Sequence, residues 1–161
     1  MFPLELHELA AEVLSRYRAA GLKLSIAESC TGGLISGCLS EIPGSSDVLD
    51  RGFVTYSYES KADLLAVPLS LMRSNGAVDG EVAKRMALGA LEAANRADVG
   101  LAVTGVAGPG QSETKPAGLV YVAGIRRGSD PVLREHRYPG NRTNVRLSAI
   151  EGALTLALEF V

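Results

Sequence analysis

Ser29 and Lys61 are the two residues of this sequence whose side chains could together perform acyl transfer. A serine hydroxyl needs a base to become a nucleophile, and a lysine can serve as that base once burial or a neighbouring group lowers its pKa toward neutrality. Tyr56, which precedes Lys61 closely, could position the amine or relay a proton. From these residues alone two plainer interpretations stay open: Ser29 as the cap of a helix, and Lys61 as a solvated surface charge.

The turn that follows Ser29 could bind negative charge. Unpaired backbone N–H groups and the positive end of a helix dipole gather where a strand passes into a helix. Thr31, Gly32 and Gly33 keep this turn small, so their N–H groups could form an oxyanion hole or hold a phosphate, and the sequence does not separate the two roles. Cys30 is a rival nucleophile, but next to Ser29 it would point into the core, where a small buried hydrophobic role is favoured.

Neither histidine is well placed to act as the base. His7 falls in an expected helix and His136 inside an expected strand, which disfavours a histidine triad. No group of His, Cys, Asp and Glu residues has the spacing of metal ligands. We therefore expect neither a catalytic metal nor another cofactor, and the lysine must activate water.

Two further stretches could hold the anionic part of a ligand. The run Gly105-Val106-Ala107-Gly108-Pro109-Gly110 matches neither a Walker loop nor a dinucleotide fingerprint. Because it follows Thr104, it could wrap a ribose or a phosphate, or it could be a plain surface loop. Asn141 and Arg142 at a helix start are a better anion site, since a guanidinium and free N–H groups can act together, although asparagine also caps helices routinely.

A regular alternation of strand and helix patterns must position these residues. Strands are expected at residues 24–28, 52–57, 99–104, 118–125 and 132–138. Helices are expected between Pro3 and Gly21, from Gly33 to about Ser40, as short pieces from Lys61 to Asn75, from Asp79 to about Asn95, and from Asn141 onward. Helices separate the first three strands, which predicts an α/β fold with parallel right-handed crossovers, whereas no helix precedes the fourth strand, which predicts an antiparallel return.

This order brings five loops to one edge of the sheet. The C-terminal ends of parallel strands share an edge, so Ser29 and the segment 56–61 emerge there, as does the start of the loop 104–117. Arg142 follows the fifth strand, which returns to the same edge. In open α/β sheets the crevice beyond the strand C-termini binds ligands, so this edge is the predicted site.

The composition limits the class of protein. With 161 residues, 47% of them hydrophobic, and a formal net charge of −2, the chain is expected to form one domain over residues 1–161. It has no apolar run of membrane-spanning length and no secretory leader, so we expect a cytoplasmic protein. It also has no stripe of Lys and Arg, so no nucleic-acid partner is expected. Cys30 and Cys38, eight residues apart in an expected helix, are too far apart for a disulfide.

Several ordered motifs together carry a resemblance to a known family. They are Ala27-Glu28-Ser29-Cys30-Thr31-Gly32-Gly33, Gly52-Phe53-Val54-Thr55-Tyr56-Ser57 with Lys61, Asn75-Gly76-Ala77-Val78, and Thr104-Gly105-Val106-Ala107-Gly108-Pro109-Gly110. The chain resembles the CinA C-terminal domain family, which includes the nicotinamide-nucleotide amidohydrolases, from about Leu6 to Phe160. This resemblance implies a three-layer α/β/α sandwich with a mixed, mostly parallel sheet. It also implies hydrolysis of the carboxamide of a pyridine nucleotide, nicotinamide mononucleotide, to nicotinic acid mononucleotide and ammonia.

The resemblance further implies a role for each matching position. It makes Ser29 the nucleophile and Lys61 the general base, and it gives Tyr56 and Thr31 supporting places. The loops that surround the nucleotide are matched by Thr104, Gly105, Gly108 and Arg142.

The sequence departs from the family pattern in ways that keep alternatives open. Tyr58 and Ser60 stand where relatives usually have Asn and Ala, and Gln111 with Ser112 interrupts a glycine run. The alternative is a nucleotide-binding or regulatory module without turnover. A hydrolase that uses the Cys30 thiol is a weaker alternative. The length leaves no room for the N-terminal domain of many relatives, so a standalone form is expected. The apolar opening and closing helices would suit a homodimer, although core packing explains them equally well.

Overall fold

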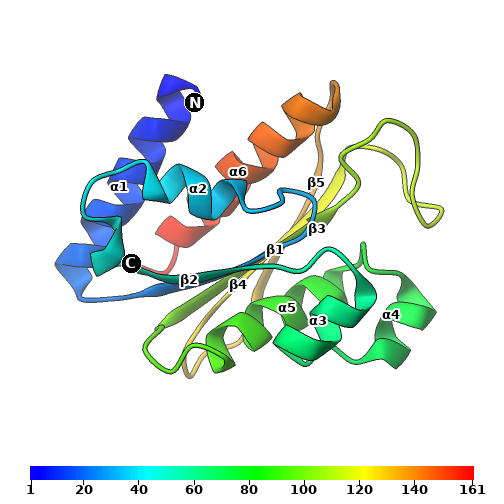
Figure 1. The fold of residues 1–161 in the computed structure, drawn as a ribbon, viewed down its shortest axis with the longest axis horizontal. Helices are drawn as coiled ribbons and strands as arrows, with labels where there is room; N and C mark the ends of the chain where they lie inside the picture. The colour runs from blue at the N-terminus through cyan, green and yellow to red at the C-terminus, as the bar shows by residue number, and fades with distance from the viewer.

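A five-stranded mixed sheet lies between two layers of helices in the computed structural model, which describes residues 1–161 (Figure 1). The strand order is β2-β1-β3-β4-β5. In chain order the strands are β1 (Leu24–Glu28), β2 (Leu49–Val54), β3 (Val99–Gly105), β4 (Leu119–Arg126) and β5 (Val132–Arg137). The predicted α/β class and the three-layer sandwich implied by the resemblance are confirmed.

All strands except β4 run in the same direction. β1 pairs in parallel with β2 and β3, whereas β4 is antiparallel to both β3 and β5. The C-terminal ends of β1, β2 and β3 therefore meet at one edge of the sheet, where β4 begins and β5 ends. The predicted parallel strands and the antiparallel return are confirmed.

The helices divide between the two faces of the sheet. One face is covered by α1 (Leu4–Ala20), α2 (Leu34–Ser40) and α6 (Arg142–Leu158), and the other by α3 (Tyr58–Leu65), α4 (Leu69–Asn75) and α5 (Gly80–Glu92) (Figure 1). A short 3-10 turn at Ser45–Asp47 precedes β2. None of these helices combines the length and the apolar character that crossing a bilayer requires.

Two hydrophobic clusters hold the three layers together. Val99, Leu101 and Val103 of β3 belong to the cluster shared with α1, α2 and α6, whereas Ala102 belongs to the cluster shared with α5. Because alternate residues of a strand point to opposite faces, a strand covered on both sides is an almost continuous apolar run, as this one is. β3 is thus a firmly packed support for the loop that leaves its C-terminal end.

The largest difference from the prediction concerns β2, which is expected at residues 52–57 but runs from Leu49 to Val54. It is an edge strand with no fully buried residue, so its start, which contains the polar residues Asp50 and Arg51, does not stand out as a strand. At its other end, Ser57 leaves the strand direction and caps α3, which begins at Tyr58 rather than at Lys61.

Local sequence features fix the helix that carries Lys61. Ser57 accepts a hydrogen bond from the Ser60 N–H, and the Ser60 hydroxyl in turn accepts one from the Ser57 N–H, which forms a capping box. At the other end of α3, a Cβ atom at Gly89 would lie 2.1 Å from the carbonyl oxygen of Leu65. Glycine at this position therefore lets α5 pack directly against the end of α3, which holds Lys61 against the sheet.

Candidate active site

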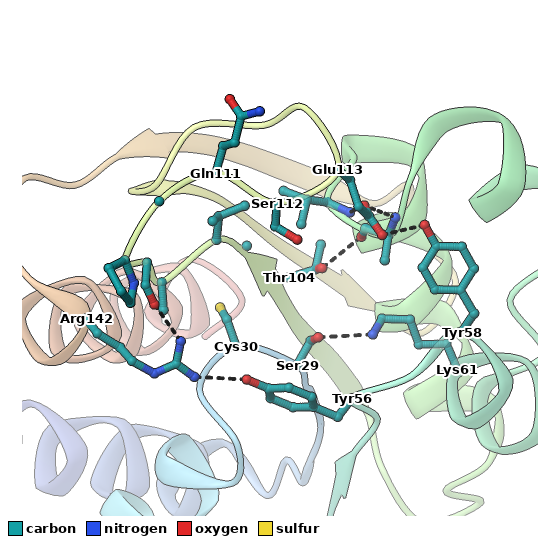
Figure 2. Close-up of a pocket in the computed structure, with 18 residues that line it drawn as sticks. Ser29, Cys30, Tyr56, Tyr58, Lys61, Thr104, Gln111, Ser112, Glu113 and Arg142 are labelled. Carbon is teal, nitrogen blue, oxygen red and sulfur yellow. Dashed lines mark hydrogen bonds between the residues drawn. The ribbon is translucent and has the colours of Figure 1, made fainter.

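A cavity of about 220 Å³ opens at the predicted edge of the sheet (Figure 2). Its lining residues come from the turn after β1 (Ser29, Cys30), from the segment entering α3 (Tyr56, Tyr58, Lys61), from the turn before α5 (Ala77, Val78), from the loop after β3 (residues 104–113) and from the start of α6 (Arg142). The segments expected at this edge do meet there. The turn at Ala77 and Val78 joins them, although the strand pattern does not place it at the edge.

The side chains of Ser29 and Lys61 meet on the wall of this cavity. Nζ of Lys61 lies 3.0 Å from Oγ of Ser29 and 2.7 Å from the carbonyl oxygen of Thr55. A neutral amine that donates to the Thr55 carbonyl keeps its lone pair available for the serine hydroxyl. The pair is therefore already within the distance over which a base can take a proton from a nucleophile.

Burial tunes the Lys61 amine for this role. The side chain is 1% exposed, and no carboxylate forms a salt bridge with it. Desolvation disfavours the charged ammonium and lowers the pKa of Lys61 from 10.5 to about 8, against a smaller opposing effect of nearby groups that include Glu113. A substantial fraction of the amine is therefore neutral near physiological pH. The plainer interpretation of Lys61 as a solvated surface charge is wrong.

The backbone around the pair is fixed by the central strands. The Ser29 N–H donates to the carbonyl oxygen of Val103 in β3, and the Thr55 N–H donates to the carbonyl oxygen of Glu28 at the end of β1. The Thr55 carbonyl that receives the lysine amine is thus tied to the strand that ends at the nucleophile. Sequence reasoning missed Thr55, because a backbone carbonyl leaves no mark on the residue type.

Most N–H groups at the start of α2 are not free, contrary to the expectation from the sequence. The buried carboxylate of Glu28 accepts hydrogen bonds from the N–H groups of Gly33, Ile35 and Ser36 and from the Ser36 hydroxyl. The Gly32 N–H donates to the carbonyl oxygen of Ser29. The expectation of free donors at Gly32 and Gly33 is therefore wrong, because the Ser29 carbonyl occupies the Gly32 donor and the Glu28 carboxylate occupies the Gly33 donor.

One donor beside the nucleophile does remain. Cys30 lines the cavity, and no backbone carbonyl of another residue accepts a hydrogen bond from its N–H. Across the cavity, the N–H groups of Ala107 and Gly108 also have no acceptor. Thr31 is fully buried, and neither it nor the two glycines after it lines the cavity. Donors for a developing negative charge thus come from Cys30 and from the loop after β3.

Arg142 anchors one side of the cavity. Its guanidinium donates to the carbonyl oxygen of Gly108 at 2.8 Å and to the hydroxyl of Tyr56 at 3.0 Å (Figure 2). The Tyr56 hydroxyl, which could have positioned the lysine amine or relayed a proton to it, therefore accepts a hydrogen bond from Arg142 instead. Thr104, at the back of the cavity, donates to the carbonyl oxygen of Ala77 at 2.8 Å. The Arg142 guanidinium is the exposed cationic group of the lining, so it is the natural partner of an anionic ligand group.

Glu113 closes the opposite side of the cavity. Its carboxylate accepts hydrogen bonds from the Tyr58 hydroxyl and from the N–H groups of Ala77 and Val78, the latter two at 2.8 and 3.4 Å (Figure 2). These contacts fasten the tip of the loop after β3 to α3 and to the turn before α5. Tyr58 and Gln111 both differ from the family pattern. Tyr58 thus has its hydrogen-bond partner, Glu113, in the same loop as Gln111.

We expect Glu113→Ala to loosen this fastening. Hydrogen exchange at the amides of Ala77 and Val78 should become about tenfold faster, because one charge-assisted acceptor holds both N–H groups closed. Exchange followed by mass spectrometry of the peptide around them measures the effect. Gln111→Ala is the matched control, since Gln111 lies in the same loop and its side chain is exposed. Equal exchange rates in the two variants would mean that Glu113 does not hold the loop.

The remaining candidates lie apart from this chemistry. His7 is on α1 and His136 on β5, as predicted, and neither lines the cavity. The two cysteines are free and buried, and burial raises the pKa of Cys30 to about 12, so its thiol is a poor nucleophile. Cys30 lies in the turn before α2 rather than inside the helix. No group of three or more His, Cys, Asp or Glu side chains is arranged to hold a metal ion.

Comparison with known proteins gives consistent matches along the chain. The model of the CinA C-terminal domain matches residues 6–161. Nicotinamide-nucleotide amidohydrolase PncC of Enterobacter agglomerans is 44% identical over 158 residues, which cover 97% of this chain and 96% of that protein. The crystal structure of competence/damage inducible protein CihA from Agrobacterium tumefaciens superposes with a TM-score of 0.95 at 45% identity, covering 99% of this chain and 97% of that one.

Other relatives are much longer than this chain. The CinA-like protein of Syntrophobacter fumaroxidans is 46% identical over 142 residues, which are 88% of this chain but 33% of that protein. Two relatives from Caldicellulosiruptor species match over 35% and 33% of their lengths. The chain thus spans about a third of these proteins and nearly all of others.

Proposed function

The chain belongs to the CinA C-terminal domain family, and from that premise we propose that it hydrolyses the carboxamide of nicotinamide mononucleotide, with Ser29 as nucleophile and Lys61 as general base. The observation that carries the proposal is the distance of 3.0 Å between the Lys61 amine and the Ser29 hydroxyl, combined with the burial of that amine. Full-length relatives named nicotinamide-nucleotide amidohydrolase support the choice of substrate.

In the first half of the reaction, neutral Lys61 takes the proton of the Ser29 hydroxyl while the serine oxygen attacks the carboxamide carbon. The carbonyl oxygen becomes an oxyanion, and the N–H of Cys30, a residue of the cavity lining, donates a hydrogen bond to it in this proposal. Collapse of this intermediate breaks the C–N bond. The lysine ammonium returns its proton to the leaving nitrogen, so ammonia departs and an ester on Ser29 remains.

In the second half, the neutral amine of Lys61 takes a proton from water, and the resulting hydroxide attacks the ester. The C–O bond to Ser29 breaks, the serine oxygen regains its proton, and nicotinic acid mononucleotide is released. The Thr55 carbonyl accepts an N–H of the amine throughout, which keeps the lysine nitrogen beside the serine oxygen in both halves. Arg142 is suited to the nucleotide phosphate, because its guanidinium lies at the rim of the same cavity.

The test is release of ammonia and nicotinic acid mononucleotide, in equal amounts, from nicotinamide mononucleotide. Only the neutral Lys61 can accept a proton, so kcat/KM should rise with pH through a midpoint near the Lys61 pKa of about 8. Below this midpoint we expect kcat/KM to fall about tenfold for each pH unit, and above about pH 9 to level off. A coupled ammonia assay between pH 6 and 10 measures the pH profile, and chromatography of the same samples measures nicotinic acid mononucleotide.

Two controls make this result decisive. Enzyme held at each pH and then assayed at pH 9 must recover full activity, which excludes unfolding as the cause of the profile. A panel of other nucleotide amides tests the substrate separately from the chemistry. Ammonia from another amide but none from nicotinamide mononucleotide would overturn the substrate, and a rate that decreases between pH 7 and 9 would overturn the role of Lys61.

A further inference from the structure

Arg146, one helical turn beyond Arg142 on α6, reaches the turn that carries the nucleophile. Its Nε donates to the carbonyl oxygen of Cys30 at 3.1 Å, and its Nη2 donates to the carbonyl oxygen of Thr31 at 2.9 Å. The side chain is partly buried and does not line the cavity, and no carboxylate pairs with it. Its hydrogen bonds are thus made with the backbone of the nucleophile turn.

These two bonds fix the orientation of successive peptide units. In a trans peptide the C=O and the following N–H point in opposite directions. With the Thr31 carbonyl drawn to Arg146, the Gly32 N–H points the other way and donates to the carbonyl oxygen of Ser29. That bond in turn sets the peptide between Ser29 and Cys30, whose N–H is the free donor next to the nucleophile. The guanidinium therefore controls, through one intermediate bond, where this donor points.

The turn needs such a clamp. Gly32 and Gly33 have φ of +61° and +94°. Glycine can change to other backbone angles at little energetic cost, so the local sequence alone defines the turn weakly. Glu28 holds only the later part of the segment, through the N–H groups of Gly33 and of the first residues of α2. Arg146 is the one side chain that holds the earlier part, where the carbonyls of Cys30 and Thr31 lie.

We propose that Arg146 is a positioning residue for acyl transfer, which holds the carbonyls of Cys30 and Thr31 and thereby aims the Cys30 N–H at the oxyanion that forms on attack by Ser29. This inference rests on the proposed Ser29 nucleophile. It assigns distinct tasks to two arginines of one helix: Arg142 faces the ligand, and Arg146 faces the backbone of the nucleophile turn. A planar guanidinium suits the second task because it can donate to two neighbouring carbonyls at once.

Arg146→Met tests the proposal, since methionine keeps an apolar stem of similar reach and removes the donors. We expect kcat for ammonia release to fall on the order of 10²-fold, as for loss of an oxyanion donor, with KM changed by less than about threefold. The midpoint of the pH profile should stay near that of the wild-type protein, because Lys61 is unchanged. Arg134→Met, which removes an exposed arginine of β5, is the control and should leave kcat unchanged.

A second readout does not depend on the amide substrate. A small fluorophosphonate labels a serine nucleophile when the serine oxygen displaces fluoride from phosphorus and its proton passes to Lys61, and the phosphoryl oxygen then occupies the oxyanion position. Labelling of Ser29 should slow on the order of 10²-fold in Arg146→Met. In Arg142→Met the main change should be a higher KM for the nucleotide rather than slower labelling. Arg146→Lys, which can reach one carbonyl, should restore part of both rates.

The outcomes separate this inference from the proposed function. Unmodified protein that is labelled at Ser29 but releases no ammonia would overturn the proposed substrate, while the labelling rates would still test Arg146. Equal labelling rates for the unmodified protein and Arg146→Met would overturn the inference. A second pattern would also overturn the inference: the labelling rate of Arg146→Met falls only in proportion to its folded fraction, measured by circular dichroism, and Arg146→Lys recovers none of it. That pattern belongs to a purely structural role.

Discussion

Ser29→Ala is expected to reduce ammonia release by roughly 10⁴-fold or more, because removal of the nucleophile eliminates the covalent route and leaves only what binding and the oxyanion donors provide. The substitution removes one oxygen atom and should leave the cavity intact. Calorimetric binding of nicotinamide mononucleotide should therefore persist with a Kd within about threefold of that of the unmodified protein. Steady-state ammonia release and calorimetry on the same preparation measure the two effects.

The matched control for this variant is Ser40→Ala, which removes an exposed hydroxyl at the end of α2 and should keep full activity. Activity retained in Ser29→Ala and lost on alkylation would transfer the nucleophilic role to the Cys30 thiol. The burial that raises the pKa of this thiol to about 12 argues against that outcome. Binding without turnover in the unmodified protein would instead identify a nucleotide-binding module.

The fold could be predicted from the sequence wherever burial and pattern agree. β1 has the predicted range, because all five of its residues are buried and a glycine-containing turn follows it. The N-caps at Asp79 and Asn141 are correct for the same local reason, since each accepts hydrogen bonds from the first turn of its helix. The predicted range of β2 is wrong by three residues at each end, because this edge strand contains polar residues that do not form an alternating strand pattern.

The candidate site could be predicted only in part. The topology brings Ser29 and Lys61 to one edge, and the structure places their reactive atoms in contact. The Thr55 carbonyl could not be found from residue types, and Glu113 lies in a loop without any periodic pattern. Arg146 is similarly hidden, because nothing in the sequence distinguishes an arginine that holds a backbone turn from one that pairs with a surface carboxylate.

These missed groups share a physical reason. Each acts through a hydrogen bond that involves a backbone group, and for Glu113 and Arg146 that group lies in a segment distant in the sequence. Such bonds depend on three-dimensional geometry rather than on local preference. The prediction of free N–H groups at Gly32 and Gly33 is wrong because the Gly32 N–H donates to the carbonyl oxygen of Ser29 and the Gly33 N–H donates to the carboxylate of Glu28. Sequence reasoning thus identifies the chemical groups of this site, whereas the structure identifies what holds them.

Lys61→Met is expected to lower kcat on the order of 10³-fold, the usual range for loss of a general base. Methionine keeps the buried stem and removes the amine. Lys61→Arg should fail equally, although it preserves a positive charge, because a guanidinium stays protonated at every accessible pH and cannot accept the Ser29 proton. Ammonia-release kinetics on both variants measure this, with Lys84→Met, a partly exposed lysine of α5 that pairs with Glu81, as the control that keeps full activity. Turnover retained in Lys61→Arg would show that the residue at position 61 does not act as the general base.

Chemical restoration of the amine separates a proton-accepting role from a packing role. Lys61→Cys treated with bromoethylamine places a thioether analogue of lysine at position 61, and its electron-withdrawing sulfur makes the amine less basic. The native thiols should react slowly, because burial raises the pKa of Cys30 to about 12 and that of Cys38 to about 11. Activity should return with a pH midpoint below that of the unmodified protein. Restored activity with an unmoved midpoint would mean that another group controls the titration, because only a base at position 61 couples the basicity of the new amine to the rate.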